Sequence, residues 1–294
     1  MSVISVKNLT QRYGNGRIIY ENLSFDVPQG RILGLLGKNG TGKTTTINIL
    51  MGFLRPLSGE CKIFDEDITA MRPETRRRIS LLLEGHVQYT FMTIEQIEKF
   101  YSKFYPSWNK EVYYELMRKL HVSDNQRIST MSCGQRSQVA LGLILAQNAE
   151  LLVLDDFSLG LDPGYRRLFV DYLRDFAKSE NKTLFMTSHI IQDMERLVDD
   201  CIMLDYGKII AQLPVKELMD TFHCYTFSVP ENITLPQDDK FIHPSVNKGR
   251  MELFSFEPEE TVRQKLISAG YPLSDFKEHK MTLEDAFIGL TGKY

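Results

Sequence analysis

The run Gly37-Lys38-Asn39-Gly40-Thr41-Gly42-Lys43-Thr44 has the residue types and spacing of a phosphate-binding loop, G-x-x-x-x-G-K-[ST]. Its glycines allow backbone N–H groups to converge on phosphate oxygens, and the start of a following helix adds positive potential. The lysine is expected to reach the β- and γ-phosphates, and the final threonine to place its hydroxyl on Mg²⁺. The residues predicted to hold a nucleotide here are Asn39, Gly40, Gly42, Lys43, Thr44 and Thr45.

Two adjacent carboxylates, Asp155 and Asp156, follow the apolar run 151–154. In phosphate-loop enzymes a carboxylate at the end of a buried strand is associated with Mg²⁺, and Asp155 suits that role. Asp156 lies where a base could orient or polarise an attacking water. Taken alone, the two acids could equally end a strand without any catalytic part.

These residues need strands and helices that hold them in place. Apolar runs and alternating patterns predict strands at 4–6, 23–27, 31–36, 79–83, 151–154, 183–187 and 250–256. The phosphate loop is followed by a predicted helix at 45–51. Strand, glycine loop and helix form the arrangement that phosphate binding requires.

Residues 93–145 have a mostly helical pattern, in which Phe100, Phe104 and Trp108 recur every four residues. Pro106 predicts two helices rather than one in this aromatic stretch. We expect the three rings to pack among the helices, the alternative being contact with a partner protein.

The composition is that of an ordinary globular protein: 294 residues, 43% hydrophobic and 25% charged. The net charge of −3, without a basic block, argues against a nucleic-acid partner. No apolar run approaches about 18 residues, and the N-terminus lacks a signal-peptide pattern, so neither a membrane span nor a secreted protein is expected. The four cysteines form no C-x-x-C pair, which favours reduced thiols in the cytosol.

The pattern changes near residue 222, beyond which Pro230, Pro236 and Pro244 interrupt it. A helix is expected to begin near 257–260 and to close at Gly270. We therefore predict two domains: a nucleotide-binding domain with the phosphate loop at 1–222, and a small α+β domain at 223–294 with an accessory or dimerisation role.

Four further segments resemble the ATP-binding cassette (ABC) family over residues 1 to about 220. Met131-Ser132-Cys133-Gly134-Gln135 resembles the family's L-S-G-G-Q signature, and Leu159-Gly160-Leu161-Asp162 resembles its D-loop. Ser188-His189 is similar to its switch histidine, and Tyr13 is placed like the aromatic residue that stacks on adenine. The resemblance implies an α/β phosphate-loop NTPase core with an antiparallel β subdomain and a helical subdomain.

The resemblance also implies roles for individual residues. Tyr13 would stack on adenine, and His189 would contact the γ-phosphate beside the base Asp156. Ser132, Gly134 and Gln135 would close over ATP bound to a second subunit, because the family works as a head-to-tail nucleotide sandwich. Without these roles, Tyr13 would be a half-buried aromatic at a strand edge and His189 a histidine bonded to a neighbour.

Three positions depart from the family pattern. Asp156 stands where the family usually has glutamate, so its carboxylate has a shorter reach and hydrolysis could be slow. Glu84 stands where a Q-loop glutamine is expected and could still bind Mg²⁺, together with Thr44 and Asp155; Gln88 is the fallback for the glutamine. Cys133 replaces a signature glycine and adds bulk.

The tail 281–292 resembles the T-L-E-D-x-F-x-x-L-T-G ending of ABC ATPases that export drugs, lipids and peptides. The segment Tyr105-Pro106-Ser107-Trp108-Asn109 is similar to one in Gram-positive exporters of antibiotics, bacteriocins and phenol-soluble-modulin-type peptide toxins. The resemblance implies ATP and Mg²⁺ as cofactors and a second ATPase subunit, with a homodimer favoured over a heterodimer. It also implies a separate polytopic transmembrane subunit contacted near 84–93. The chain would then lie at the cytoplasmic face of a bacterial plasma membrane and drive export of a hydrophobic or amphipathic substrate.

Two other functions remain open at this point. One is a nucleotide-gated regulatory or structural subunit that scarcely hydrolyses ATP, which Asp156 supports. The other is a soluble ABC ATPase acting on DNA or ribosomes, although such proteins usually carry a second cassette, a coiled-coil insertion or a basic surface.

Overall fold

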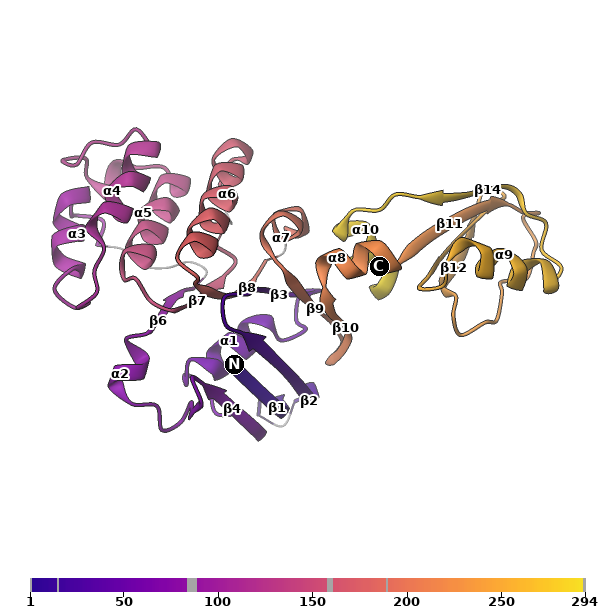
Figure 1. Ribbon diagram of the computed structural model, residues 1–294, viewed down its shortest axis with the longest axis horizontal. Helices are drawn as coiled ribbons and strands as arrows, with labels where there is room; N and C mark the ends of the chain where they lie inside the picture. Colours follow the sequence, from indigo (N-terminus) through magenta and orange to yellow (C-terminus); the bar gives the residue numbers. More distant parts are fainter. Residues whose placement is uncertain (1, 15, 84–88, 158–160, 189, 293–294) are drawn as a thin grey trace. The chain divides into compact units, whose positions relative to one another are not determined.

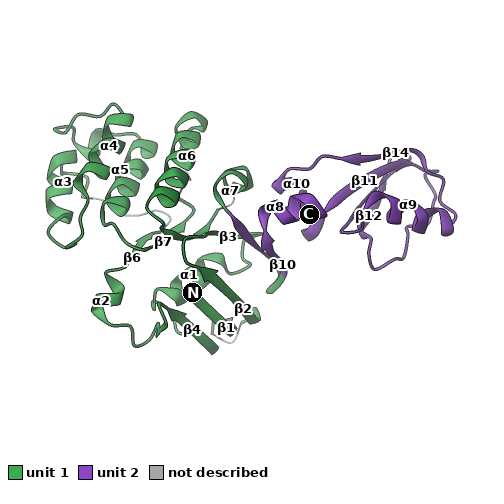
Figure 2. Cartoon of the chain, viewed as in Figure 1, with its two compact units in different colours: residues 1–198, 204–209 green, residues 199–203, 210–294 purple. Residues whose placement is uncertain are grey.

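The computed structural model describes residues 2–14, 16–83, 89–157, 161–188 and 190–292 (Figure 1). The chain divides into two compact units, one formed by residues 1–198 and 204–209 and the other by 199–203 and 210–294 (Figure 2). The second unit thus begins before the domain boundary predicted at 222/223. The accessory role expected for 223–294 stays a prediction.

An antiparallel sheet opens the first unit, with strand order β2-β1-β4-β5. Strand β1 pairs with both β2 and β4. The strands are β1 (Ser2–Arg12), β2 (Ile18–Pro28), β4 (Ser58–Ile63) and β5 (Glu66–Asp67). Alternating burial along β2 gives one face to the core and the other to solvent, which confirms the strands predicted at 4–6 and 23–27.

Four parallel strands lie at the centre of the same unit, in the order β3-β8-β7-β6. The strands are β3 (Ile32–Gly37), β6 (Ile79–Leu82), β7 (Leu151–Asp155) and β8 (Thr183–Thr187). Every residue of β7 and β8 is buried, as continuous apolar runs predict for a sheet covered on both faces. Helix α1 (Lys43–Leu50) contacts β3, β4 and β7. The helix that follows the phosphate loop therefore packs against strands of both sheets.

Helices make up the rest of the unit, and α3, α4 and α5 form a group of their own (Figure 1). The helices are α2 (Pro73–Arg76), α3 (Ile94–Tyr101), α4 (Lys110–Lys119), the 3₁₀ turn η1 (Ile128–Thr130), α5 (Cys133–Ala146), α6 (Pro163–Ser179) and α7 (Ile191–Leu197). The break between α3 and α4 contains Pro106, as predicted. Phe100 packs edge-on against Phe104, but Phe104 remains exposed, so the aromatic stretch is only partly used for internal packing.

Strands β9 (Asp200–Asp205) and β10 (Lys208–Pro214) are divided between the units, with the turn 204–209 belonging to the first. In the described residues no helix is long and apolar enough to cross a membrane.

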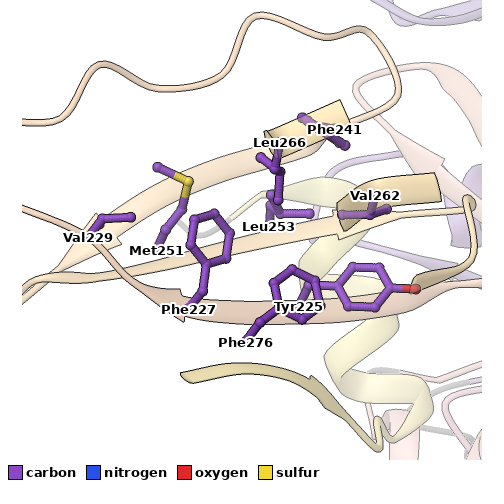
Figure 3. Packing of buried hydrophobic residues seen from close by; sticks show 9 residues of the cluster. All are labelled: Tyr225, Phe227, Val229, Phe241, Met251, Leu253, Val262, Leu266 and Phe276. Atoms are coloured by element: carbon purple, nitrogen blue, oxygen red, sulfur yellow. The ribbon is translucent and has the colours of Figure 1, made fainter. Parts of the chain in front are cut away.

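The second unit contains an antiparallel sheet in the order β12-β13-β11-β14. Its elements are α8 (Val215–Thr221), β11 (His223–Ser228), β12 (Ile242–Asn247), β13 (Arg250–Ser255), α9 (Glu259–Ser268), β14 (Ser274–His279) and α10 (Leu283–Thr291). Figure 3 shows side chains from one face of the sheet, such as Phe227 and Leu253, directed toward Val262 and Leu266 of α9. Tyr225 and Phe276 extend the same core. The unit is therefore α+β with a core of its own.

Helix α10 buries its apolar face inside this unit. Leu283 and Phe287 are buried, and the helix contacts α8, β12 and β13. Gly289 lies against the ring of Phe254, so closely that a Cβ would come within 2.6 Å of it. The apolar face of α10 is thus covered by other elements of the same unit.

Candidate nucleotide site

The phosphate loop joins the buried strand β3 to α1, as the sequence predicted. Gly42 caps the helix with φ 102°, and Gly40 has φ 80°. A Cβ at Gly42 would lie 2.6 Å from Ile19 and 2.7 Å from the ring of Tyr20. Only glycine fits this position, because both the backbone conformation and the close approach exclude a side chain.

Lys43 is held against the loop by its own backbone. Its ammonium donates to the carbonyl oxygens of Gly37 at 2.8 Å and Lys38 at 3.2 Å, and the residue is only 7% exposed. Burial lowers the pKa of Lys43, while the carboxylates of Asp156 and Asp155 act to raise it. A cation held in a poorly solvated site interacts strongly with any anion that enters the loop.

The carboxyl ends of β7 and β8 lie side by side. Asp155 pairs with Thr187 in the parallel register, and the Thr187 hydroxyl donates to the Asp155 carboxylate. Asp155 is 1% exposed, so this bond fixes a buried carboxylate near Lys43. Asp156 follows with φ 46°, a left-handed conformation that aspartate and asparagine tolerate better than most residues. Its backbone N–H donates to the Thr187 carbonyl at 3.2 Å.

Thr44, Thr45 and Tyr13 lie around the loop. Thr44 is exposed at the first turn of α1, whereas Thr45 is buried. The Tyr13 hydroxyl lies 3.2 Å from the Thr45 hydroxyl, which ties the aromatic residue to the phosphate loop. Tyr13 is 54% exposed, so much of its surface is available to a flat ligand.

The donors near the loop suit a hard divalent cation. Mg²⁺ prefers oxygen ligands and is usually held by one or two carboxylates together with the phosphates of a substrate. The exposed Thr44 hydroxyl and the Asp155 carboxylate supply such oxygens. Within the described ranges, no cluster of three or more His, Cys, Asp or Glu residues could hold a metal ion by itself.

The signature segment begins α5. Ser132 is the N-cap: its hydroxyl accepts from the Gln135 N–H at 3.1 Å, and its own N–H donates to Gln135 Oε1 at 3.0 Å. The two polar side chains predicted to face a nucleotide therefore form a capping box in the single chain. Gly134 is partly exposed, and the Cys133 thiol is exposed and free.

Several predicted residues lie outside the described ranges. These are Glu84, Gln88 and His189, and with them Leu159 and Gly160 of the D-loop. Asp162, at the end of that loop, caps α6 by accepting from the Gly164 and Tyr165 N–H groups.

The structure places Tyr206, which the sequence analysis did not single out, beside the phosphate loop. The Arg17 guanidinium lies 5.5 Å and the Lys38 ammonium 6.0 Å from the centroid of its ring. Tyr206 is 66% exposed and has φ 38°, which is uncommon for a tyrosine. The sequence Tyr206-Gly207 between apolar runs indicates a tight turn, but nothing local indicates that the turn reaches Lys38.

Comparisons with known proteins agree with this geometry. Residues 20–158 match the family model described as ABC transporter. The chain is 31% identical to the bacitracin transport ATP-binding protein BcrA of Bacillus licheniformis, over 99% of this chain and 98% of that protein. It is 26% identical to the Nod factor export ATP-binding protein I of Cupriavidus metallidurans, over 99% and 98% of the two chains.

The fold also has solved counterparts. The ATP-binding subunit of an ABC transporter superimposes with a TM-score of 0.65 at 23% identity, covering 74% of this chain and 92% of the other. A dimeric ATP-binding cassette in a post-hydrolysis state with ADP and Pi gives 0.62 at 20% identity, covering 72% and 98%. At these identities the likeness concerns the fold, and it confirms the predicted α/β core with its antiparallel and helical parts.

Proposed function

Because this chain belongs to the ABC transporter family of ATP-binding proteins, we propose that it is the ATP-hydrolysing subunit of an exporter whose membrane part is a separate chain. The observation that carries the proposal is the arrangement of Lys43, Asp155 and Asp156 at one edge of the parallel sheet. A buried cation faces two carboxylates there, beside a loop built for phosphates. This arrangement suits hydrolysis of a nucleoside triphosphate better than simple binding.

ATP with Mg²⁺ is the proposed substrate. Lys43 would neutralise the β- and γ-phosphates, and Thr44 with Asp155 would hold the cation. Asp156 would orient the attacking water, and Tyr13, tied to Thr45, would stack on adenine. By resemblance, Glu84 would assist at the metal and His189 at the γ-phosphate. Mg²⁺ would supply neutralisation of the charge that develops on the phosphoryl oxygens.

We propose that the working form is a homodimer with two nucleotides between the subunits. Ser132, Gly134 and Gln135 of one subunit would contact the nucleotide of the other. The capping box of the single chain presents the signature at a helix N-terminus, where backbone N–H groups favour an anion. Engagement of ATP requires only that the Ser132 hydroxyl donate to the phosphate while it still accepts from Gln135.

The proposed cargo is a hydrophobic or amphipathic molecule such as a peptide. Support comes from the match, over nearly the full length of both chains, with a bacitracin transport ATP-binding protein. The membrane subunit would dock near the segment 84–93 at the cytoplasmic face of the membrane.

A nucleotide-gated subunit with little hydrolysis is the second candidate. The shorter side chain of Asp156, set on a left-handed backbone, favours it. Measured turnover in the presence of the membrane partner separates the two functions.

The test uses the chain expressed together with the polytopic membrane protein whose gene lies beside its own. We expect the two to co-purify and to hydrolyse ATP, and Lys43→Ala to abolish hydrolysis and weaken ATP binding at least about tenfold, because the phosphate charge is left uncompensated. Lys7→Ala, an exposed lysine on β1, is the control and should hydrolyse ATP at the parental rate. An unchanged ATP affinity in Lys43→Ala would refute the nucleotide site, and failure of the chain to co-purify with the membrane protein would refute the transporter role.

A further inference from the structure

A groove of about 590 Å³ lies between α6 and α7, outside the nucleotide site. Its polar lining is dominated by four arginines: Arg166, Arg167, Arg174 and Arg196. The carboxylates that line it are those of Asp193 and Glu195. The two helices are neighbours in the first unit, so both walls of the groove belong to the same compact body.

The four guanidinium groups of this groove outnumber its two carboxylates, so the groove keeps a net positive charge. Arg166 forms an ion pair with Asp193, its Nε lying 3.1 Å from Oδ1. Arg174 donates to the carbonyl oxygen of Arg196 at 2.9 Å, which fixes its guanidinium but leaves its charge. Within the described ranges no ion pair involves Arg167, Arg174 or Arg196, and all three are exposed. An exposed guanidinium cluster of this kind attracts carboxylates and phosphates.

Asp193 adds a second requirement for a ligand. The residue is 6% exposed, and its Oδ2 atom is buried without a hydrogen-bond partner. A buried carboxylate oxygen without a partner costs free energy, so a donor from a bound molecule would be favoured at this place. The ligand should therefore carry N–H or O–H donors as well as negative charge.

The spacing of the arginines favours an extended peptide. Arg167 and Arg174 are seven residues apart on α6, which places them about 10 Å apart along the helix axis. In an extended peptide with the polyproline II conformation, which has three residues per turn, the side chains of residues i and i+3 lie on the same face, about 9 Å apart. An inorganic anion is too small to bridge the two positions, and a flat membrane surface cannot follow a groove between two helices.

We propose that the α6–α7 groove binds an acidic, extended peptide segment of another protein, with carboxylates at positions i and i+3. One carboxylate contacts Arg167 and the other contacts Arg174 and Arg196. Peptide N–H groups between them donate to the free oxygen of Asp193. The groove is thus a docking surface that works independently of nucleotide chemistry.

The test uses a fluorescein-labelled Gly-Glu-Ala-Ala-Glu-Gly peptide and the full chain, with binding followed by fluorescence polarisation at low ionic strength. The matched control is the Gly-Gln-Ala-Ala-Gln-Gly peptide, which has the same shape without charge. We expect the Glu peptide to bind at least about fivefold more tightly, and Arg167→Gln/Arg174→Gln to remove that difference. Arg55→Gln/Arg118→Gln removes two exposed arginines elsewhere and should leave binding unchanged.

Two further arms separate the groove from other anion sites. Lys43→Ala should retain peptide binding, so that failure of the nucleotide site and failure of the groove can be told apart. Inorganic phosphate at the concentration of the peptide should displace little of it, because one phosphate cannot bridge Arg167 and Arg174. Equal binding of both peptides, or binding to phosphatidylglycerol vesicles in place of the peptide, would overturn the proposal.

Discussion

At the residue scale, Asp156 is the position that we expect to set the rate of ATP hydrolysis. Its φ of 46° is accessible to asparagine at little cost, so Asp156→Asn removes the negative charge without disturbing the backbone. If Asp156 is the base, we expect hydrolysis to fall by a factor of about 10²–10⁴ while ATP binding persists. Initial-rate measurements of phosphate release, with Lys43→Ala as the inactive reference, test this. A parental rate for Asp156→Asn would assign the base to another group.

A second substitution at this position, Asp156→Glu, tests the cost of its left-handed backbone conformation. Asp156→Glu gives the side chain the reach that the family usually has, but glutamate occupies left-handed conformations less readily than aspartate. We expect this variant to unfold at a lower temperature than the parent whether or not its turnover rises. Thermal unfolding measured beside turnover separates the two effects. An unfolding temperature equal to that of the parent would show that the conformation imposes no cost here.

Tyr206 offers a second test at this scale. Its ring lies under two cations, Arg17 and Lys38, and an exposed cation–π contact contributes about 0.5–1 kcal/mol. We expect Tyr206→Ala to weaken ATP binding about two- to fivefold by freeing Lys38, with little change in turnover at saturating ATP. Tyr206→Phe keeps the ring and should bind ATP like the parent. Titration calorimetry gives both affinities, and equal losses in the two variants would point to the hydroxyl instead.

At the element scale, the signature segment combines a helix cap with a predicted nucleotide contact. Ser132→Ala removes the capping box of α5 and should lower the free energy of unfolding by about 1 kcal/mol. Thr93→Ala removes a capping box of the same kind from α3 and should cost a similar amount. Only Ser132→Ala should also impair the ATP-induced dimer seen in light scattering. If both variants dimerise normally, Ser132 is only a cap.

Strands and helices with a clear local pattern of apolar residues or glycines could be predicted from the sequence. The strands β3, β7 and β8 are continuous apolar runs buried on both faces, and the phosphate loop fixes its helix through Gly42. Strand β12 was harder to predict because it contains Pro244, a residue that lacks an N–H donor. In the structure β12 is an edge strand, where a missing donor is tolerated.

Some residues of the candidate site could also be predicted from the sequence, and others could not. Lys43, Asp155 and Asp156 follow from motifs, because the ends of parallel strands meet at one edge of the sheet. The Ser132–Gln135 box could have been found from its S-x-x-Q spacing, but the family resemblance gave those residues another role. Tyr206 could not have been found, since its contact with Lys38 depends on how two distant turns fold against each other.

At the scale of the whole molecule, the residues of the nucleotide site in the described ranges all belong to the first compact unit. The second unit has its own core, and α10 is buried within it. We therefore expect two thermal transitions in calorimetry. ATP stabilises only the state that binds it, so saturation at about 100 times the Kd should add about 2.7 kcal/mol to one transition and leave the other unchanged.

Two matched aromatic pairs assign the transitions to the units. Phe25 stacks on Phe185 in the first unit, with ring centroids 5.6 Å apart, and Phe222 stacks on Phe254 in the second, at 5.8 Å. Replacing a buried phenylalanine by alanine costs about 3–5 kcal/mol. We expect Phe25→Ala to lower the ATP-sensitive transition and Phe254→Ala the other one, with ATP affinity unchanged in Phe254→Ala. A single transition that moves with both substitutions would mean that the two units unfold together. In that case loss of the C-terminal part would impair ATP binding by lowering the stability of the first unit.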